Sequence, residues 1–257
     1  MNFKLFNFLT LINFCFSFHL PSENKFNKQI SMNLFETGID LGILTVGTGL
    51  ILDNTVSFNS TQIVKKSKDL YDEGYKKSNI NLLLLGPLYF SGVNYFVIHN
   101  YHSKVNFYEI LPLVVIHNIG YYIMHRSMHK NKHLTKLHSF HHKFKDTVFP
   151  SIGNAVTHSE FTFAYMMPFI IGAIIVKPGI ENFKIAILLI SIFNLVIHCE
   201  ELKKIQYNEF MVSPNQHIEH HRAKNISKKT YSAPIFNIDI LKLRFENFIS
   251  ILNNFDI

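Results

Sequence analysis

The apolar residues of this chain are gathered into long runs, and this clustering limits the possible folds more than any other feature of the sequence. A soluble domain distributes such residues over amphipathic elements, each of which turns a polar face to water. Charged residues make up only 17% of the chain, against about 25% in an average soluble domain, so few side chains remain to solvate the runs. The sequence therefore predicts an all-α, polytopic membrane protein.

Several runs have the length and composition of membrane helices. The better candidates are residues 80–99, 107–124, 161–176 and 183–197. The last two are slightly shorter than the ~20 residues needed to cross hydrocarbon, so they either dip into the membrane and return or rely on a locally thinner bilayer. Residues 34–52 form a weaker span, and residues 4–20 form a cleaved signal peptide, a first span or a membrane-surface helix. We expect about four to six transmembrane or re-entrant helices.

The net charge of +7 is concentrated in short polar segments between the runs, such as residues 65–68, 76–77, 126–145 and 224–229. Lys and Arg accumulate on the cytosolic side of membrane proteins, so these segments are expected to face the cytosol. A basic patch also suits nucleic acid, but no nucleic-acid motif accompanies the charge, and we expect no such partner. The two cysteines form no metal-binding or redox motif.

Histidines lie at the polar edges of the runs in three patterns, which we call histidine boxes. The boxes are His125-x3-His129, His138-x2-His141-His142 and His217-x2-His220-His221. Residues i, i+3 and i+4 share one face of a helix, so each box can direct imidazoles to a metal, while the adjacent pair diverges toward two ions. With 15 histidines in 257 residues, H-x-x-H-H is expected about 0.05 times per chain, so coincidence explains two copies poorly. Several imidazoles without a thiolate suit iron, copper, nickel or zinc.

The order of runs and boxes supports one shared site. Residues 161–176 and 183–197 lie between the second and third boxes, and two crossings or two partial dips return the chain to the face that it left. All three boxes are therefore expected on the same side of the membrane, as one metal site requires. The alternative interpretation is a solvated, histidine-rich basic surface that binds anionic lipid.

This order of boxes around a membrane hairpin resembles the fatty acid hydroxylase/sterol desaturase superfamily of integral-membrane, non-haem di-iron enzymes. The resemblance runs from about residue 109 to 245 and includes YYIMHRSMH at the first box, NAVTHSE with His158, and VIHCEE with His198. It implies a catalytic region in residues 109–257, preceded by membrane spans and a basic loop in residues 1–108. It also implies ten metal ligands and no further catalytic residue. These ligands are His125, His129, His138, His141, His142, His158, His198, His217, His220 and His221.

Other positions are less regular. His19, His99, His102 and His133 lack a box partner and are expected in loops or interfaces, whereas His117, two helical turns before His125, stays open as a ligand or a neighbour of one. The family usually has an acid where this chain has Asn118, which can accept a hydrogen bond but brings no charge. Glu160 stands one residue closer to His158 than the family's "HP.E" pattern. Of the closing "WD..FGT" segment only Ile238–Asp239 remains.

The resemblance implies O2-dependent oxidation of a lipid C–H bond by two iron ions, with electrons from a cytochrome b5-type donor and its reductase. The chain has no haem-binding HPGG segment and no flavin or dinucleotide motif, so the donor is expected to be a separate protein. The expected location is the endoplasmic reticulum membrane, with the boxes facing the cytosol. The spacing favours a sterol C4-methyl-oxidase-like enzyme of sterol biosynthesis, with fatty-acyl or sphingolipid hydroxylation next. Two alternatives are other chemistry on the same scaffold, such as aldehyde decarbonylation or carotenoid hydroxylation, and a non-catalytic membrane protein with a structural metal site.

Overall fold

The computed structural model of the protein describes residues 25–63, 68–98, 104–145, 147–205, 207–222 and 230–255. Within these ranges all regular secondary structure is helical, and a single isolated antiparallel bridge joins Met211 to Phe236. The all-α fold expected from the sequence is confirmed. The segment of residues 4–20 lies outside the described ranges, so its interpretation stays a prediction.

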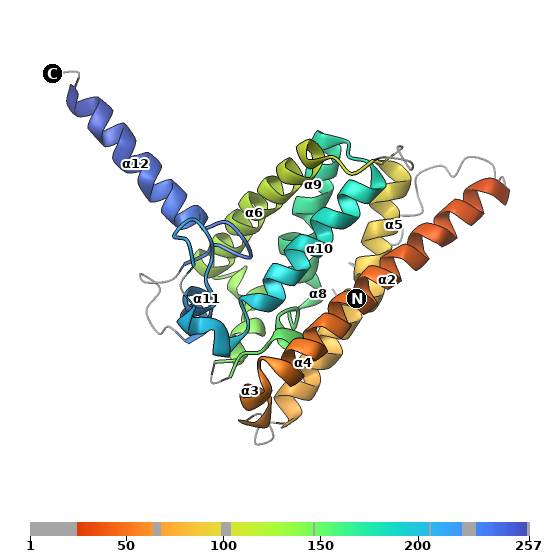
Figure 1. Ribbon diagram of the computed structural model, residues 1–257, viewed down its shortest axis with the longest axis horizontal. Coiled ribbons are helices and arrows are strands. Elements are labelled where there is room, and N and C mark those ends of the chain that lie inside the picture. The colour runs from red at the N-terminus through yellow and green to blue at the C-terminus, as the bar shows by residue number, and fades with distance from the viewer. Residues whose placement is uncertain are drawn as a thin grey trace.

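Five helices pack side by side to form the body of the protein (Figure 1). They are α2 (Lys25–Thr55), α5 (Gly86–Phe96), α6 (Phe107–Lys130), α9 (Met167–Val176) and α10 (Ile180–Val196). The most extensive contacts join α2 to α5, α9 to α6 and α10 to α6. Buried side chains of these helices form a shared apolar core that includes Phe90, Leu113, Phe169 and Phe183. The helices before and after residue 108 are therefore packed together.

Some of these helices can cross a bilayer. By length and composition, the candidates among the described residues are Asn33–Thr55, Phe107–Lys130 and His158–Val176. The last is longer than the sequence suggested, because the short helix α8 (His158–Glu160) continues into the apolar run. α10 has 17 residues and a length of about 26 Å, less than the ~30 Å of hydrocarbon. Large apolar side chains such as Ile51, Ile123 and Ile175 point outward, which suits contact with lipid.

Two prolines shape the inner helices. Pro87 and Pro168 each stand in the first turn of a helix, and each follows a π-helical segment. These segments are η2 (Asn81–Leu85), which links α4 (Lys68–Ile80) to α5, and η5 (Phe161–Met166), which precedes α9. Proline has no N–H to donate and its ring crowds the preceding turn, and in both places a wider π turn accommodates the missing bond. Gly120 lets α6 approach Pro168, since a Cβ at Gly120 would lie 2.8 Å from the Pro168 Cβ.

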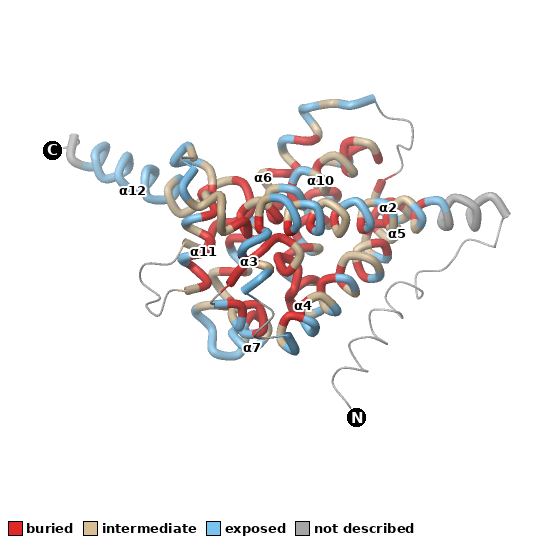
Figure 2. The backbone as a smooth tube through the Cα atoms, turned by 60° about the horizontal axis from the view of Figure 1, so that its bottom comes forward, coloured by how far each residue is buried: buried red, intermediate tan, exposed pale blue. Residues whose placement is uncertain are grey.

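The chain after α10 contains two short helical elements and one long helix. η6 (Glu200–Lys204) and α11 (Pro214–Arg222) are short, whereas α12 (Ile238–Phe255) has 18 residues. α12 projects from the body and is exposed along most of its length (Figures 1 and 2). Its first turn is anchored by Asp239, whose Oδ2 accepts hydrogen bonds from the backbone N–H of Tyr231 at 2.8 Å and the hydroxyl of Ser232 at 2.7 Å.

Candidate metal centre

Four separate segments bring their histidines to one end of the helical body. The last two turns of α6 carry the first box, and α7 (Thr135–His138) and the 3-10 turn η3 (His141–Lys143) carry the second. His198 follows the end of α10, and α11 carries the third box. Because α9 and α10 form the hairpin between the second and third boxes, the chain returns to the same end, as the sequence predicted.

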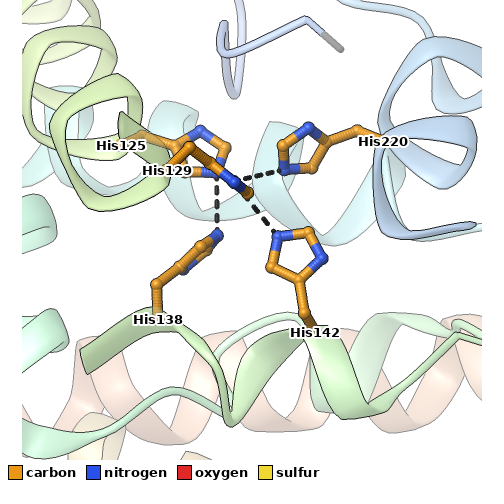
Figure 3. A group of neighbouring side chains, drawn as sticks. All are labelled: His125, His129, His138, His142 and His220. Carbon is orange, nitrogen blue, oxygen red and sulfur yellow. Dashed lines mark hydrogen bonds between the residues drawn. The ribbon is translucent and has the colours of Figure 1, made fainter. Parts of the chain in front are cut away.

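Five imidazoles converge in one group, which we call the five-histidine group (Figure 3). Its members are His125, His129, His138, His142 and His220. Their ligand atoms all lie within 4.8 Å of one another, and neighbouring Nε2 atoms are 3.0–3.2 Å apart. Ligands about 2.1 Å from a common metal ion, at right angles to each other, would be ~3 Å apart. The donor set and its spacing therefore fit a transition metal.

Four more imidazoles form a second cluster, the four-histidine group, of His141, His198, His217 and His221. The Nε2 atoms of His217 and His198 are 3.0 Å apart, and those of His221 and His217 are 3.3 Å apart. All four side chains are buried, and the Nε2 of His141 has no hydrogen-bond partner among the described residues. A buried nitrogen lone pair that faces other nitrogen atoms is the arrangement that a metal ion stabilises.

The far side of several rings is held by an oxygen acceptor. Nδ1 of His125 lies 2.9 Å from the Tyr231 carbonyl oxygen, and Nδ1 of His198 lies 2.6 Å from the Asn194 carbonyl oxygen. A carbonyl oxygen can only accept, so Nδ1 carries the proton in both rings and Nε2 keeps its lone pair. Such outer contacts fix the tautomer and orientation of metal-binding histidines.

A carboxylate completes this outer layer. Glu160 is 1% exposed, and its Oε1 lies 2.5 Å from Nδ1 of His138. Of the contacts to the far side of the grouped rings, this one comes from a carboxyl group, and an acceptor of this kind strengthens the donor power of the His138 Nε2 atom toward a cation. Although Glu160 stands one residue closer to His158 than in the family pattern, it contacts a box histidine.

The electrostatic environment keeps the rings outside the membrane helices neutral. Burial, followed by the neighbouring imidazoles, holds the pKa of His141, His217 and His221 well below its usual value. Burial also lowers the pKa of His198 to about 4. A histidine must be neutral to bind a metal, so these rings are ready to act as ligands at pH 7 without losing a proton.

Nine of the ten histidines that the resemblance implied as ligands lie in the two groups, and His158 does not. Its Nδ1 lies 2.8 Å from Oδ1 of Asn81, away from both groups. Residues two apart on a helix point about 200° apart, so with Glu160 turned toward His138, His158 is directed elsewhere. His133 is exposed and outside both groups, and His117 is buried in α6 but outside them. His19, His99 and His102 lie outside the described residues.

Asn118 acts through the backbone of a distant loop. Its Oδ1 accepts hydrogen bonds from the N–H groups of Ile235 at 3.0 Å and Phe236 at 3.1 Å, and its Nδ2 donates to the Val114 carbonyl at 2.8 Å. The same loop includes Tyr231, whose carbonyl holds His125. Asn118 therefore supports the five-histidine group indirectly and does not orient a histidine itself. A carboxylate at this position could accept both loop N–H groups but could not donate to Val114.

Comparison with protein families adds an independent finding. A family model described as "Fatty acid hydroxylase" matches residues 110–241, about half of the chain. The chain belongs to the fatty acid hydroxylase family. No curated protein and no solved structure matches it. The matched residues contain both histidine groups, Glu160 and the Tyr231 loop, so the region that matches the fatty acid hydroxylase family includes the candidate metal centre. The protein is an integral-membrane oxidoreductase that acts on lipid.

Proposed function

We propose that this fatty acid hydroxylase family protein uses two non-haem iron ions to oxidise a lipid C–H bond with O2. The observation that carries the proposal concerns two pairs of sequence-adjacent histidines, because the two members of each pair belong to different groups. His141 and His142 belong to different groups, and so do His220 and His221. In each pair the ring centroids are about 6 Å apart, 6.2 Å and 6.1 Å respectively. Two metals held by the same two turns would lie close enough to act as a pair.

Each part of the candidate metal centre has a role in the proposed oxidation. The five-histidine group would hold one ion and the four-histidine group the other, and the metal pair would supply O2 activation and electron transfer. The rings supply neutral nitrogen ligands, and their burial keeps bulk water from the reacting centre. The contacts from Glu160 and the Tyr231 carbonyl fix the direction of His138 and His125. The bundle supplies the apolar surroundings that a lipid requires.

The electron source and substrate are part of the same proposal. The basic residues around the boxes suit docking of an acidic electron carrier, for which we propose a cytochrome b5-type protein with its reductase. For the substrate we favour a sterol, with a fatty-acyl lipid or sphingolipid as the second candidate. The spacing of the boxes and the His198 segment support the sterol. Lipid profiling of cells that express the protein, compared with cells that express an inactive ligand variant, would identify the substrate class.

Metal content tests the core of the proposal. The purified protein is expected to contain about two metal ions per chain, because two groups of imidazoles have ligand geometry. Chelation should lower the thermal midpoint, because a metal that binds only the folded state stabilises it. Elemental analysis with less than about 0.2 metal per chain after expression in metal-rich medium would contradict the proposal. Zinc in place of iron would not, because nitrogen sites readily take up zinc during overexpression.

We also propose that the metal centre faces the cytosol from the endoplasmic reticulum membrane. Asn59-Ser60-Thr61 and Asn225-Ile226-Ser227 are formal glycosylation acceptors, and neither is expected to carry glycan in microsomes. His102→Thr provides the positive control, because it makes Asn100 an acceptor in the segment between α5 and α6. That segment precedes α6, which is 24 residues and about 36 Å long and carries the first box in its last two turns. Glycan at Asn59 and none at Asn100 would mean that the metal centre faces the lumen and would contradict this orientation.

A further inference from the structure

A cavity lies within the helical body, between α2, α5, η5, α9 and α10. Its volume is about 70 Å³, and most of its lining is apolar, with Leu41, Phe90, Phe169 and Ile190 among the contributing side chains. The five helices of the body and the π-helical segments η2 and η5 supply nearly all of its wall. An apolar cavity bounded by a few polar groups can hold part of a ligand, whereas sites that enclose a whole ligand usually have ~300–1,000 Å³.

His117 is the polar side chain that most constrains a ligand in this cavity. It lines the cavity, is 1% exposed, and lies against the ring of Phe169 with 4.2 Å between ring centroids. Its Nε2 is 3.2 Å from the Tyr165 carbonyl oxygen. Because a carbonyl can only accept, Nε2 carries the proton, and Nδ1 of the neutral ring presents a lone pair. That Nδ1 has no hydrogen-bond partner among the described residues.

Tyr165 also lines the cavity, and its hydroxyl has no hydrogen-bond partner among the described residues, whereas the hydroxyls of Tyr89 and Thr45 are satisfied by the protein itself. The Tyr89 hydroxyl donates to the Thr162 hydroxyl at 2.9 Å, and the Thr45 hydroxyl donates to the Leu41 carbonyl at 2.8 Å. A buried acceptor without a partner costs stability, so the lone pair of His117 is a feature that a ligand can use. The matching ligand group is a hydrogen-bond donor.

The cavity adjoins the metal centre from the membrane side. His117 precedes His125 by eight residues on α6, which corresponds to about 12 Å along the helix axis. Asn194 also lines the cavity, and its carbonyl accepts the hydrogen bond from His198 of the four-histidine group. Asn194 thus belongs both to the wall of the cavity and to the residues that hold the rings of the metal centre.

We propose that this cavity binds part of the lipid substrate and that His117 Nδ1 accepts a hydrogen bond from a hydroxyl or amide N–H of that lipid. The inference rests on the proposed function and specifies its substrate class as a lipid alcohol or lipid amide. An ester, thioester or ether has no donor for Nδ1 and would leave its lone pair buried and unpaired.

A matched pair of probes tests this inference. Binding of 1-dodecanol and of its methyl ether is measured on detergent-solubilised protein that was expressed in metal-rich medium, because only the alcohol carries a hydrogen-bond donor. The wild-type protein is expected to bind the alcohol about tenfold more tightly, as one buried hydrogen bond allows. His117→Phe should bind both probes equally, whereas His117→Gln, whose side-chain oxygen can accept, should keep part of the preference. Ser191→Phe, which fills the cavity from α10, should weaken binding of both.

Equal binding of the two probes by the wild-type protein would overturn the inference, and so would an undiminished preference in His117→Phe. The wild-type comparison decides even if the Phe variant fails to fold, which its thermal midpoint would reveal. Metal content is measured on the same samples, and it separates this inference from the proposed function. A protein that prefers the alcohol but holds no metal would refute the function and keep the subsite. A protein that holds two metals but binds the alcohol and the ether equally would refute the subsite and leave the proposed function standing.

Discussion

Replacement of His142 by Ala is expected to lower lipid oxidation by more than about 100-fold and to reduce bound metal. His142 is one of five converging rings, and its Nε2 lies 3.2 Å from that of His129. Its removal leaves a coordination position that water can fill, so the remaining ion is held more weakly and in a different environment. The same result is expected for His141, His220 and His221. The measurement is product formation and metal per chain at equal expression.

His133→Ala is the matched control for this prediction. His133 follows His129 by four residues, so the spacing alone would allow both on one helix face. The structure ends α6 at Lys130 and leaves His133 exposed in the following turn, outside both groups. The variant should keep its metal and its activity. If it lost metal as fully as His142→Ala, the division of this histidine-rich stretch into ligands and bystander would be wrong.

Replacement of Glu160 by Ala should have the next largest effect, a loss of about 10–100-fold in metal affinity. The substitution removes the acceptor 2.5 Å from Nδ1 of His138 and leaves that N–H buried without a partner. Glu160→Gln retains an oxygen acceptor without the charge, so an intermediate affinity is expected. Metal affinity is measured by competition with a chelator of known strength.

Glu219→Gln provides the control for charge alone. Glu219 lies between His217 and His220 on α11, but its side chain is exposed, and the substitution should leave metal affinity unchanged. If Glu160→Ala bound metal as tightly as the wild type, the contact between Glu160 and His138 would have no role in holding the metal. If Glu160→Gln matched Glu160→Ala, the negative charge would matter more than the acceptor oxygen.

The sequence predicted the parts of this centre that depend on local periodicity. The three boxes follow helical spacing, so the faces that His125 and His129 or His217 and His221 share could be deduced without a structure. The hairpin between the second and third boxes also placed them at one end of the molecule. His158 and Glu160 were harder, because both stand in one short helical turn and only the register of that turn decides which one faces inward.

Backbone contacts across long stretches of the chain left no signal in the sequence. The Tyr231 carbonyl holds His125 over 106 positions, and any residue type supplies a carbonyl. Asn118 binds the N–H groups of Ile235 and Phe236 over 117 and 118 positions, again without a side-chain partner. The fold shows the same limit. The length of α12 depends on where Asp239 anchors its first turn, which apolar periodicity does not reveal.

The division of His141–His142 and His220–His221 between the two groups has a consequence for how the protein acquires its metals. An ion bound by the five-histidine group would immobilise both adjacent pairs, and so would already order half of the ligands of the four-histidine group. The entropic cost of fixing those turns is incurred with the first ion, and the second ion binds to a partly assembled site. Loading should therefore be positively cooperative, so that empty and fully loaded molecules coexist during assembly while singly loaded ones stay scarce.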